Sequence, residues 1–310
     1  MRQVKYIHFV NAAKTFNIPK IDCHFNDLDT KKIEKVKQVI KDKSLYYSEF
    51  GELEYSTNDY KVEYENLLTT LPKLKTRNQK AFIFIDPYEY NYIKASQIKN
   101  LMSQGNAEVL LWLPTQFMYR FSSNGTPEAL KDFIIELIPN FSDWRPGNVW
   151  NFVAQLKEGF QNYLGEKLFV DTFTIQKDVN TVFCLFFFTS HIKGFEKMLE
   201  AKWEIDTEQG KGWDYAGNQP SLFYDNKTNP LEEKLKEYMK GQKRYNGELY
   251  EFTLKQGFLP KHTNEIFYNW QNNEKLEVIN ASGEKARKKS FYIVYNYYKD
   301  DNKKVNFNLK

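Results

Sequence analysis

Residues 81–88, AFIFIDPY, place an acid, a proline and an aromatic ring directly after five apolar residues. A continuous apolar run of this length predicts a strand that is buried on both faces of a parallel sheet. Open α/β sheets bind ligands at the carboxyl ends of their strands, so we expect Asp86, Pro87 and Tyr88 at the rim of a ligand site. The alternative is structural, because Asp-Pro is also a common stop between a strand and a turn.

The segments around this strand alternate between strand and helix patterns. Strands are predicted at residues 21–25, 81–85 and 108–113. Helices are predicted at residues 33–40, 64–71, 93–102, 127–138 and 149–164. Residues 43–59 show no clear period and are predicted to form a loop, and Pro72 is expected to end the helix before it. Such alternation predicts a parallel sheet with helices on both faces.

A hairpin closes this region. Residues 168–175 and 181–189 are two strand patterns that a short polar link joins, and a helix over 191–203 follows. Class I methyltransferases end an otherwise parallel sheet with one reversed strand inserted by a hairpin, and residues 182–189 resemble that strand. We therefore expect residues 1–229 to form an α/β domain with a Rossmann-like, mostly parallel sheet and one reversed strand. Residues 206–229, rich in Gly, Asn and Asp, are predicted to be a linker.

Composition excludes several classes of protein. The longest apolar run, residues 182–188, is too short to span a bilayer, and the first sixteen residues lack the apolar core of a secretory signal. Cys23 and Cys184 lie in strand-like runs, so we expect reduced core cysteines, not a disulfide or metal site. A cytoplasmic protein with no membrane partner is expected. The sequence also contains no glycine-rich phosphate loop and no serine nucleophile motif.

Positive charge is concentrated at the carboxyl end of the chain. Residues 231–310 contain 16 Lys and Arg against 11 Asp and Glu, a net charge of +5, whereas the whole chain carries only +4. A nearly neutral body with a basic appendage is typical of proteins that contact nucleic acid.

The pattern of this appendage, residues 230–310, predicts a winged helix. Helices are expected near residues 231–239, 247–252 and 260–270, and strands at 276–279 and 291–295. In that fold the third helix enters the major groove and the wing touches phosphates. The residues expected to face base edges are Lys261, His262 and Asn264. The residues expected to contact phosphates are Lys285, Arg287, Lys288 and Lys289. The alternative is a protein-docking module whose charged hairpin tip is simply solvated.

Asp86-Pro87-Tyr88 resembles the reacting-base motif of amino-methyltransferases. The resemblance implies that Asp86 and the Pro87 carbonyl hold an exocyclic amine and that Tyr88 stacks on the base. It also implies that Asn26 and Asp27, at the end of the second sheet strand, bind the ribose hydroxyls of S-adenosylmethionine. For Asp27 the alternative is a helix N-cap, a position that aspartate favours.

Several segments in this order resemble the three-Cys-motif partner (TcmP) family, a bacterial group. The resembling segments are residues 84–88, 110–114 with Arg120 after them, 187–194, and the part from Gly257 onward. The resemblance implies a methyltransferase-like sheet and a partner, a three-Cys-motif protein. Family members usually open with a strand and a turn like Asp-x-Phe-Ala-Gly-x-Gly, which this sequence lacks. A partner chain, a second copy or a rearranged N-terminus would then have to cover the resulting gap in the sheet.

Three functions are consistent with these sequence features. The first is an S-adenosylmethionine-dependent methyltransferase that acts on nucleic acid, or an inactive relative of one. The second is a non-catalytic nucleic-acid-binding or adaptor protein that keeps the sheet as a scaffold. The third is a nuclease, with candidate metal ligands Asp22, Asp27, Asp29 and Asp86, but no Glu-x-Lys pair accompanies them.

Overall fold

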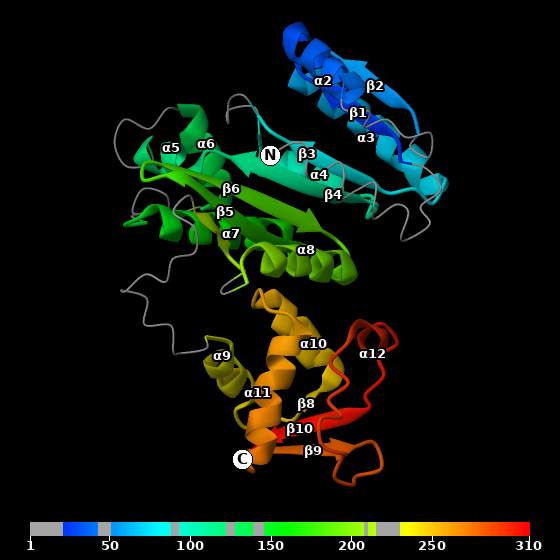
Figure 1. Cartoon of the computed structure of the whole chain (residues 1–310), viewed down its shortest axis with the longest axis vertical. Coiled ribbons are helices and arrows are strands. Elements are labelled where there is room, and N and C mark those ends of the chain that lie inside the picture. The colour runs from blue at the N-terminus through cyan, green and yellow to red at the C-terminus, as the bar shows by residue number, and fades with distance from the viewer. Residues whose placement is uncertain are drawn as a thin grey trace. The chain divides into compact units, whose positions relative to one another are not determined.

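The computed structural model describes residues 21–42, 51–87, 93–121, 128–138, 146–207, 210–214 and 230–310 (Figure 1). The chain divides into two compact units, Met1–Lys73 and Leu74–Lys310, and each is described by itself. The domain boundary predicted between residues 229 and 230 adjoins residues 215–229, which lie outside the described part, so it stays a prediction.

The first unit contains a small parallel sheet of two strands, β1 (Cys23–Asn26) and β2 (Leu53–Ser56). The predicted strand at 21–25 is confirmed, but it pairs with β2 in this separate sheet and is not a strand of the main sheet. The loop predicted over 43–59 is wrong at β2. Its four residues are too few to show a period, and its place is fixed by tertiary bonds such as the one from Ser56 Oγ to Asn26 Oδ1, 2.8 Å.

Two helices accompany these strands, α2 (Thr30–Asp42) and α3 (Tyr60–Thr76), which continues past the end of the unit. Both were predicted, but Pro72 lies inside α3 and does not end it. Leu71, directly before the proline, is only 1% exposed. Burial of such a side chain stabilises by roughly 1.5–3 kcal/mol, enough to offset much of the cost of a proline in a helix.

The second unit is built on a five-stranded sheet with the order β3-β4-β6-β5-β7. The strands are β3 (Ala81–Ile85), β4 (Ala107–Leu113), β5 (Phe169–Asp178), β6 (Thr181–Thr189) and β7 (Gly212–Asp214). β6 forms a hairpin with β5 and runs antiparallel to both of its neighbours, so the predicted reversed strand is confirmed. The pairs β3–β4 and β5–β7 are parallel, and the sheet as a whole is therefore mixed.

β7 was missed, since it lies in the predicted linker. Only three residues pair with β5, and Gly212 comes so close to Thr174 that an added Cβ would lie 2.2 Å from its hydroxyl oxygen. A segment that short carries no periodic signal, and only the approach of two backbones defines it as a strand.

Helices cover both faces of this sheet. They are α4 (Ala95–Met102), α5 (Thr115–Phe121), α6 (Glu128–Leu137), α7 (Val149–Leu164) and α8 (Ile192–Ile205). Phe160 of α7 lies 5.4 Å from Phe186 and 5.0 Å from Phe188, between ring centroids. Phe195 of α8 stacks on Phe169 of β5, which pairs across the sheet with Thr189 of β6. Because successive residues of a strand point to opposite faces, Phe169 and Thr189 lie on the face opposite to that of Phe186 and Phe188. The predicted two-sided packing is therefore present.

β3 is not buried on both faces as predicted. Ile83 and Ile85 are 8% and 7% exposed, whereas Phe82 and Phe84 are each 49% exposed. β3 lies at one end of the strand order of this sheet. Its register with β4 places Phe82 and Phe84 on the same face of the sheet as α8, but α8 packs over β5 and β6. An apolar sequence alone does not show how far that covering helix extends.

A winged-helix domain follows. Its elements are α9 (Pro230–Met239), β8 (Arg244–Tyr245), α10 (Asn246–Lys255), α11 (Pro260–Asn272), β9 (Leu276–Asn280), α12 (Tyr295–Lys299) and β10 (Val305–Leu309). The three predicted helices and the first strand are confirmed. The second predicted strand, 291–295, is wrong, because β9 pairs with β10. Lys289 and Tyr292 have φ angles of 66° and 54°, which break an extended strand.

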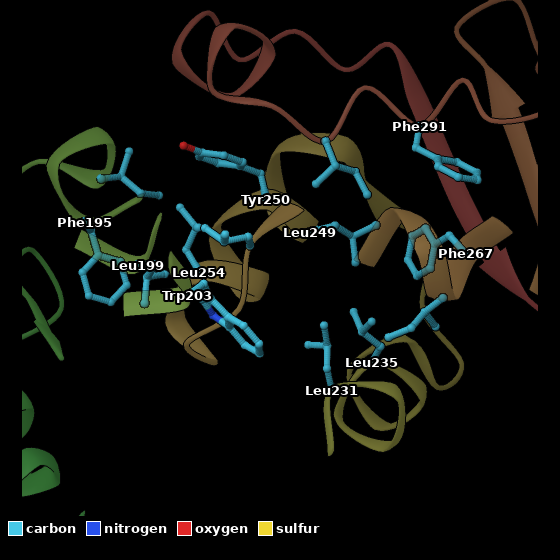
Figure 2. Packing of buried hydrophobic residues seen from close by; sticks show 14 of the residues in the cluster. Phe195, Leu199, Trp203, Leu231, Leu235, Leu249, Tyr250, Leu254, Phe267 and Phe291 are labelled. Carbon is cyan, nitrogen blue, oxygen red and sulfur yellow. The ribbon is translucent and has the colours of Figure 1, made fainter. Parts of the chain in front are cut away.

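One continuous hydrophobic cluster joins the winged helix to the main sheet. Figure 2 shows Phe195, Leu199 and Trp203 of α8 on one side of this cluster. The other labelled residues belong to the winged helix, and they are Leu231, Leu235, Leu249, Tyr250, Leu254, Phe267 and Phe291. The Trp203 ring of α8 lies 5.6 Å from Phe258 and 4.2 Å from His262, between ring centroids, so the winged helix is packed against α8.

Candidate nucleic-acid interface

The helix α11 has one buried face and one polar face. Thr263, Ile266, Phe267 and Trp270 are buried. The Thr263 hydroxyl lies 2.7 Å from that of Thr253 on α10, and the Trp270 indole donates to Glu232 of α9 at 2.9 Å. These contacts fix the rotation of α11. The opposite face carries the polar side chains Lys261, Asn264, Glu265, Tyr268, Asn269 and Asn272.

The wing, residues 281–290, leaves β9 and folds back toward α11. Its four predicted phosphate contacts, Lys285, Arg287, Lys288 and Lys289, are all exposed, and we call them the wing bases. Lys288 Nζ donates to Asn272 Oδ1 at 3.4 Å, and Lys289 N donates to Gln271 Oε1 at 3.2 Å. The structure thus brings the wing bases beside the carboxyl-terminal half of α11.

Tyr268 is a functional candidate that sequence reasoning missed. The Lys289 ammonium lies 4.1 Å from the centroid of its ring. This ammonium is the second cause, after a hydrogen bond with Asn272, that lowers the pKa of the Tyr268 phenol. The position of Tyr268, seven residues after Lys261 on the helix, was the available signal, because residues seven apart share a helix face.

The wing bases carry uncompensated charge. Among the described residues, no carboxylate lies within ion-pair distance of any of them, or of Lys261. Bases on α9 and α10 differ, since Lys236 pairs with Glu233 at 2.7 Å and Lys255 with Glu251 at 2.6 Å. An unneutralised basic segment beside a polar helix face is the electrostatic arrangement that attracts phosphates.

The three predicted base contacts occupy different environments. Lys261 is exposed. The His262 ring lies 4.2 Å from Trp203 of α8, and its Nδ1 accepts a hydrogen bond from Leu259 N at 3.1 Å. Burial, with a smaller effect of Lys261, lowers the pKa of His262 to about 4. Asn264 Oδ1 is buried and accepts no hydrogen bond among the described residues. His262 therefore caps α11 and packs on α8, while base contact by these residues stays a prediction.

At the main sheet, Asp86 is exposed and Pro87 half-buried directly after β3, where both were predicted. Tyr88 lies outside the described residues. Two residues of the segments that resemble the TcmP family have structural contacts: Trp112 stacks on Phe183 at 4.8 Å, and Arg120 donates to the Asn180 carbonyl at 3.3 Å. The catalytic assignment of Asp86, Pro87 and Tyr88 stays a prediction.

Asn26 and Asp27 are engaged in local bonds of the first unit. Asn26 Oδ1 accepts from Ser56 Oγ and Asn58 N at 2.8 and 2.9 Å, so the side chain ties β1 to the segment after β2. Asp27 Oδ1 accepts from Asp29 N at 2.9 Å, and Oδ2 pairs with Lys32 at 3.1 Å. The N-cap anticipated as the alternative for Asp27 is instead Asp29, whose Oδ1 accepts from Lys31 N at 2.9 Å at the start of α2.

Residues 189–194, which connect β6 to α8, contact the winged helix. His191 caps α8 through Nδ1, which accepts from Lys193 N at 3.1 Å, and its Nε2 lies 3.4 Å from the Tyr295 hydroxyl. Lys193 pairs with Glu196, which also accepts from Tyr250 OH at 2.9 Å. Burial is the first cause that lowers the pKa of His191. The contacts of this segment hold two parts of the chain together.

Residues 212–283 match the model of the GMT-like wHTH domain. The match covers α9, α10, α11 and β9, and it agrees with the winged-helix fold of this part of the chain. No curated protein and no solved structure matched the chain. The matched segment ends before the wing bases, so the role of these bases rests on their contacts with α11.

Within the part of the chain that the structure describes, no three His, Cys, Asp or Glu side chains gather closely enough to hold a metal ion. Both Cys23 and Cys184 are free thiols, Cys184 buried and Cys23 half-buried. Across the same described ranges, no helix combines the length and the apolar character that crossing a membrane requires.

Proposed function

We propose that this protein binds double-stranded DNA through α11 and the wing. The observation that carries the proposal is the convergence of the unpaired wing bases on the polar face of α11, within a winged-helix domain. The B-form major groove is wide enough for an α-helix, whereas the A-form groove of duplex RNA is too narrow for side chains to read. DNA is therefore the duplex that fits a helix presented in this way.

The test is a salt titration of the full chain with a fluorescent, mixed-sequence DNA duplex, followed by anisotropy. Neutralised phosphates release counterions, so log K should fall linearly with log salt, with a slope of about −0.9 for each phosphate contact. A duplex RNA of the same sequence should bind more weakly. Affinity that does not change with salt would exclude phosphate contact by the wing bases.

A methyltransferase-like enzyme is the second candidate. It is favoured by the exposed position of Asp86 at the carboxyl end of β3 and by the reversed strand β6. The assignment of Asn26 and Asp27 to the ribose of S-adenosylmethionine has less support, because both side chains already accept local hydrogen bonds. We therefore derive no catalytic step from S-adenosylmethionine.

Thermal shift separates the two candidates. Cofactor at about a hundredfold its dissociation constant should stabilise the fold by roughly 2.7 kcal/mol. No change of Tm at saturating S-adenosylmethionine would remove the enzyme and leave the DNA-binding proposal intact. In that case the main sheet serves as a scaffold or adaptor surface, and a three-Cys-motif protein is the partner to test first in a binding assay.

A further inference from the structure

We infer that DNA contact is centred on the wing and the carboxyl-terminal half of α11, and not on the first turn of that helix. The inference rests on the proposed function and specifies its site. In helix-turn-helix proteins the amino-terminal residues of the recognition helix usually contact the bases. Three observations point away from that arrangement in this protein.

First, α8 covers the side of the amino-terminal turn of α11 on which His262 lies, while Lys261 stays exposed. Trp203 Nε1 donates to the Gly257 carbonyl at 2.9 Å, and the Trp203 ring lies 4.2 Å from His262. Phe258 completes the contact, with its centroid 5.6 Å from Trp203. Figure 1 shows the turn between α10 and α11 directed at α8, with β9 at the opposite end of α11. A duplex that approaches the first turn from this side therefore meets α8.

Second, the flank of α11 that faces α9 is acidic. Glu232 and Glu265 line a small hollow there together with Asn269. The hydrogen bond from Trp270, followed by the contact with Lys236, lowers the pKa of Glu232, so this carboxylate is ionised at neutral pH. Glu232 also pairs with Lys236 at 3.4 Å, so Glu265, which forms no ion pair among the described residues, is the carboxylate that repels phosphates on this flank.

Third, the opposite flank is basic and its shape is fixed. Lys288 and Lys289 are held against Asn272, Gln271 and Tyr268 by two hydrogen bonds and a cation–ring contact. Lys289 adopts a φ of 66°, in the left-handed region that few residues other than glycine enter. The wing therefore presents its lysines from a defined turn next to the last two turns of α11.

The three observations together assign separate roles on one surface. Lys288 and Lys289 contact phosphates, and Tyr268 and Asn272 are the side chains placed to reach base edges beside them. Asn272 carries an amide, the group that pairs with adenine in a major groove. Lys261, exposed on the first turn next to the residues that α8 covers, is peripheral to this surface.

The experiment compares two double variants of the full chain on the same DNA duplex. Lys288→Gln with Lys289→Gln alters the wing, and Lys240→Gln with Lys243→Gln removes two exposed lysines near the end of α9. Both lower the net charge equally, so long-range attraction changes alike. The wing variant should reduce the salt slope by about 2 and weaken binding roughly tenfold. The α9 variant and Lys261→Gln should leave the slope nearly unchanged.

Each outcome decides the inference. Equal losses in both double variants, or a larger loss in Lys261→Gln than in the wing variant, would place the DNA elsewhere while binding itself stands. Failure of the unsubstituted chain to bind the duplex would reject the proposed function instead. Should the wing variant have a lowered Tm, Lys285→Gln with Arg287→Gln replaces it, since these exposed side chains lie on the same wing.

Discussion

Replacing Asp171 by Asn should strongly destabilise the second unit. Asp171 lies on β5 and is 1% exposed. Its Oδ1 accepts from Lys157 of α7 at 2.7 Å, and its Oδ2 pairs with the buried Lys202 of α8. Asparagine keeps the size of the side chain but removes the charge, so Lys202 would remain charged and buried with no counterion.

The expected cost follows from the burial of each partner. Removing one member of a buried ion pair typically costs about 3–5 kcal/mol, because the remaining charge is uncompensated. The side chain of Lys157 is 32% exposed and that of Lys202 only 5%, so Lys157 can turn to water and Lys202 cannot. Loss of Lys202 pairing should dominate. For a unit of this size the cost corresponds to a Tm lower by roughly 6–20 °C.

The assay is urea denaturation of wild type, Asp171→Asn, Asp171→Leu, Lys202→Met and the double variant that combines the last two. Each single variant should lose about 3–5 kcal/mol, while the double variant, with no buried charge, should lie close to wild type. A cost below about 1 kcal/mol for Asp171→Asn, or additive losses in the double variant, would refute this account.

The pH dependence of the free energy of unfolding at low pH gives an independent check. Burial alone would raise the pKa of Asp171, but Lys202 and Lys157 outweigh it and hold the pKa at about 2, below the ordinary value of 3.8. A lowered folded-state pKa contributes stability that is present above the unfolded value. Asp171 should therefore stabilise the fold above about pH 4, and this contribution should disappear as the pH falls toward 2.

Three further predictions concern the contacts between elements. Tyr250→Phe removes the hydrogen bond to buried Glu196 and should cost about 1.5–3 kcal/mol in urea denaturation, whereas Tyr298→Phe, whose partner Glu251 is more exposed, should cost less. Gly159→Ala places a Cβ 2.7 Å from the Leu137 carbonyl oxygen and should lower Tm despite the better helix propensity of alanine; Gly247→Ala, whose nearest neighbour is 3.7 Å away, should not. His262 has a folded-state pKa of about 4 against an ordinary 6.5, so stability should decline as the pH drops from 6.5 to 4, and His262→Gln should flatten that decline. An unchanged pH profile in His262→Gln would contradict the burial of this ring.

Sequence patterns were reliable wherever an element was long and its period clear. The helices α7 and α8, the β5–β6 hairpin and the three winged-helix helices all appear within a few residues of their predicted bounds. The strands that were missed, β2, β7, β8 and β10, are short, and their identity depends on a partner distant in sequence. Burial was also misjudged at β3, because the extent of a covering helix is a tertiary property.

The candidate interface shows the same division. The basic composition of the wing and the polar face of α11 could be recognised from residue types alone. Which turn of α11 is accessible to DNA could not be recognised in this way. The residue that packs on His262, Trp203, lies more than fifty positions earlier in the chain and belongs to another part of the fold. The pairing of Lys289 with Tyr268 likewise depends on the left-handed turn that directs the wing back toward the helix.

By itself, the sequence determined the order of the long elements, the reversed hairpin, the winged-helix pattern and the position of the excess positive charge. Local periodicity and composition encode these features within a few turns of chain. The tertiary structure decided which strands pair, which face of β3 is covered, and which end of α11 stays accessible. Those properties depend on packing and hydrogen bonds between residues far apart in the chain, which no local pattern contains.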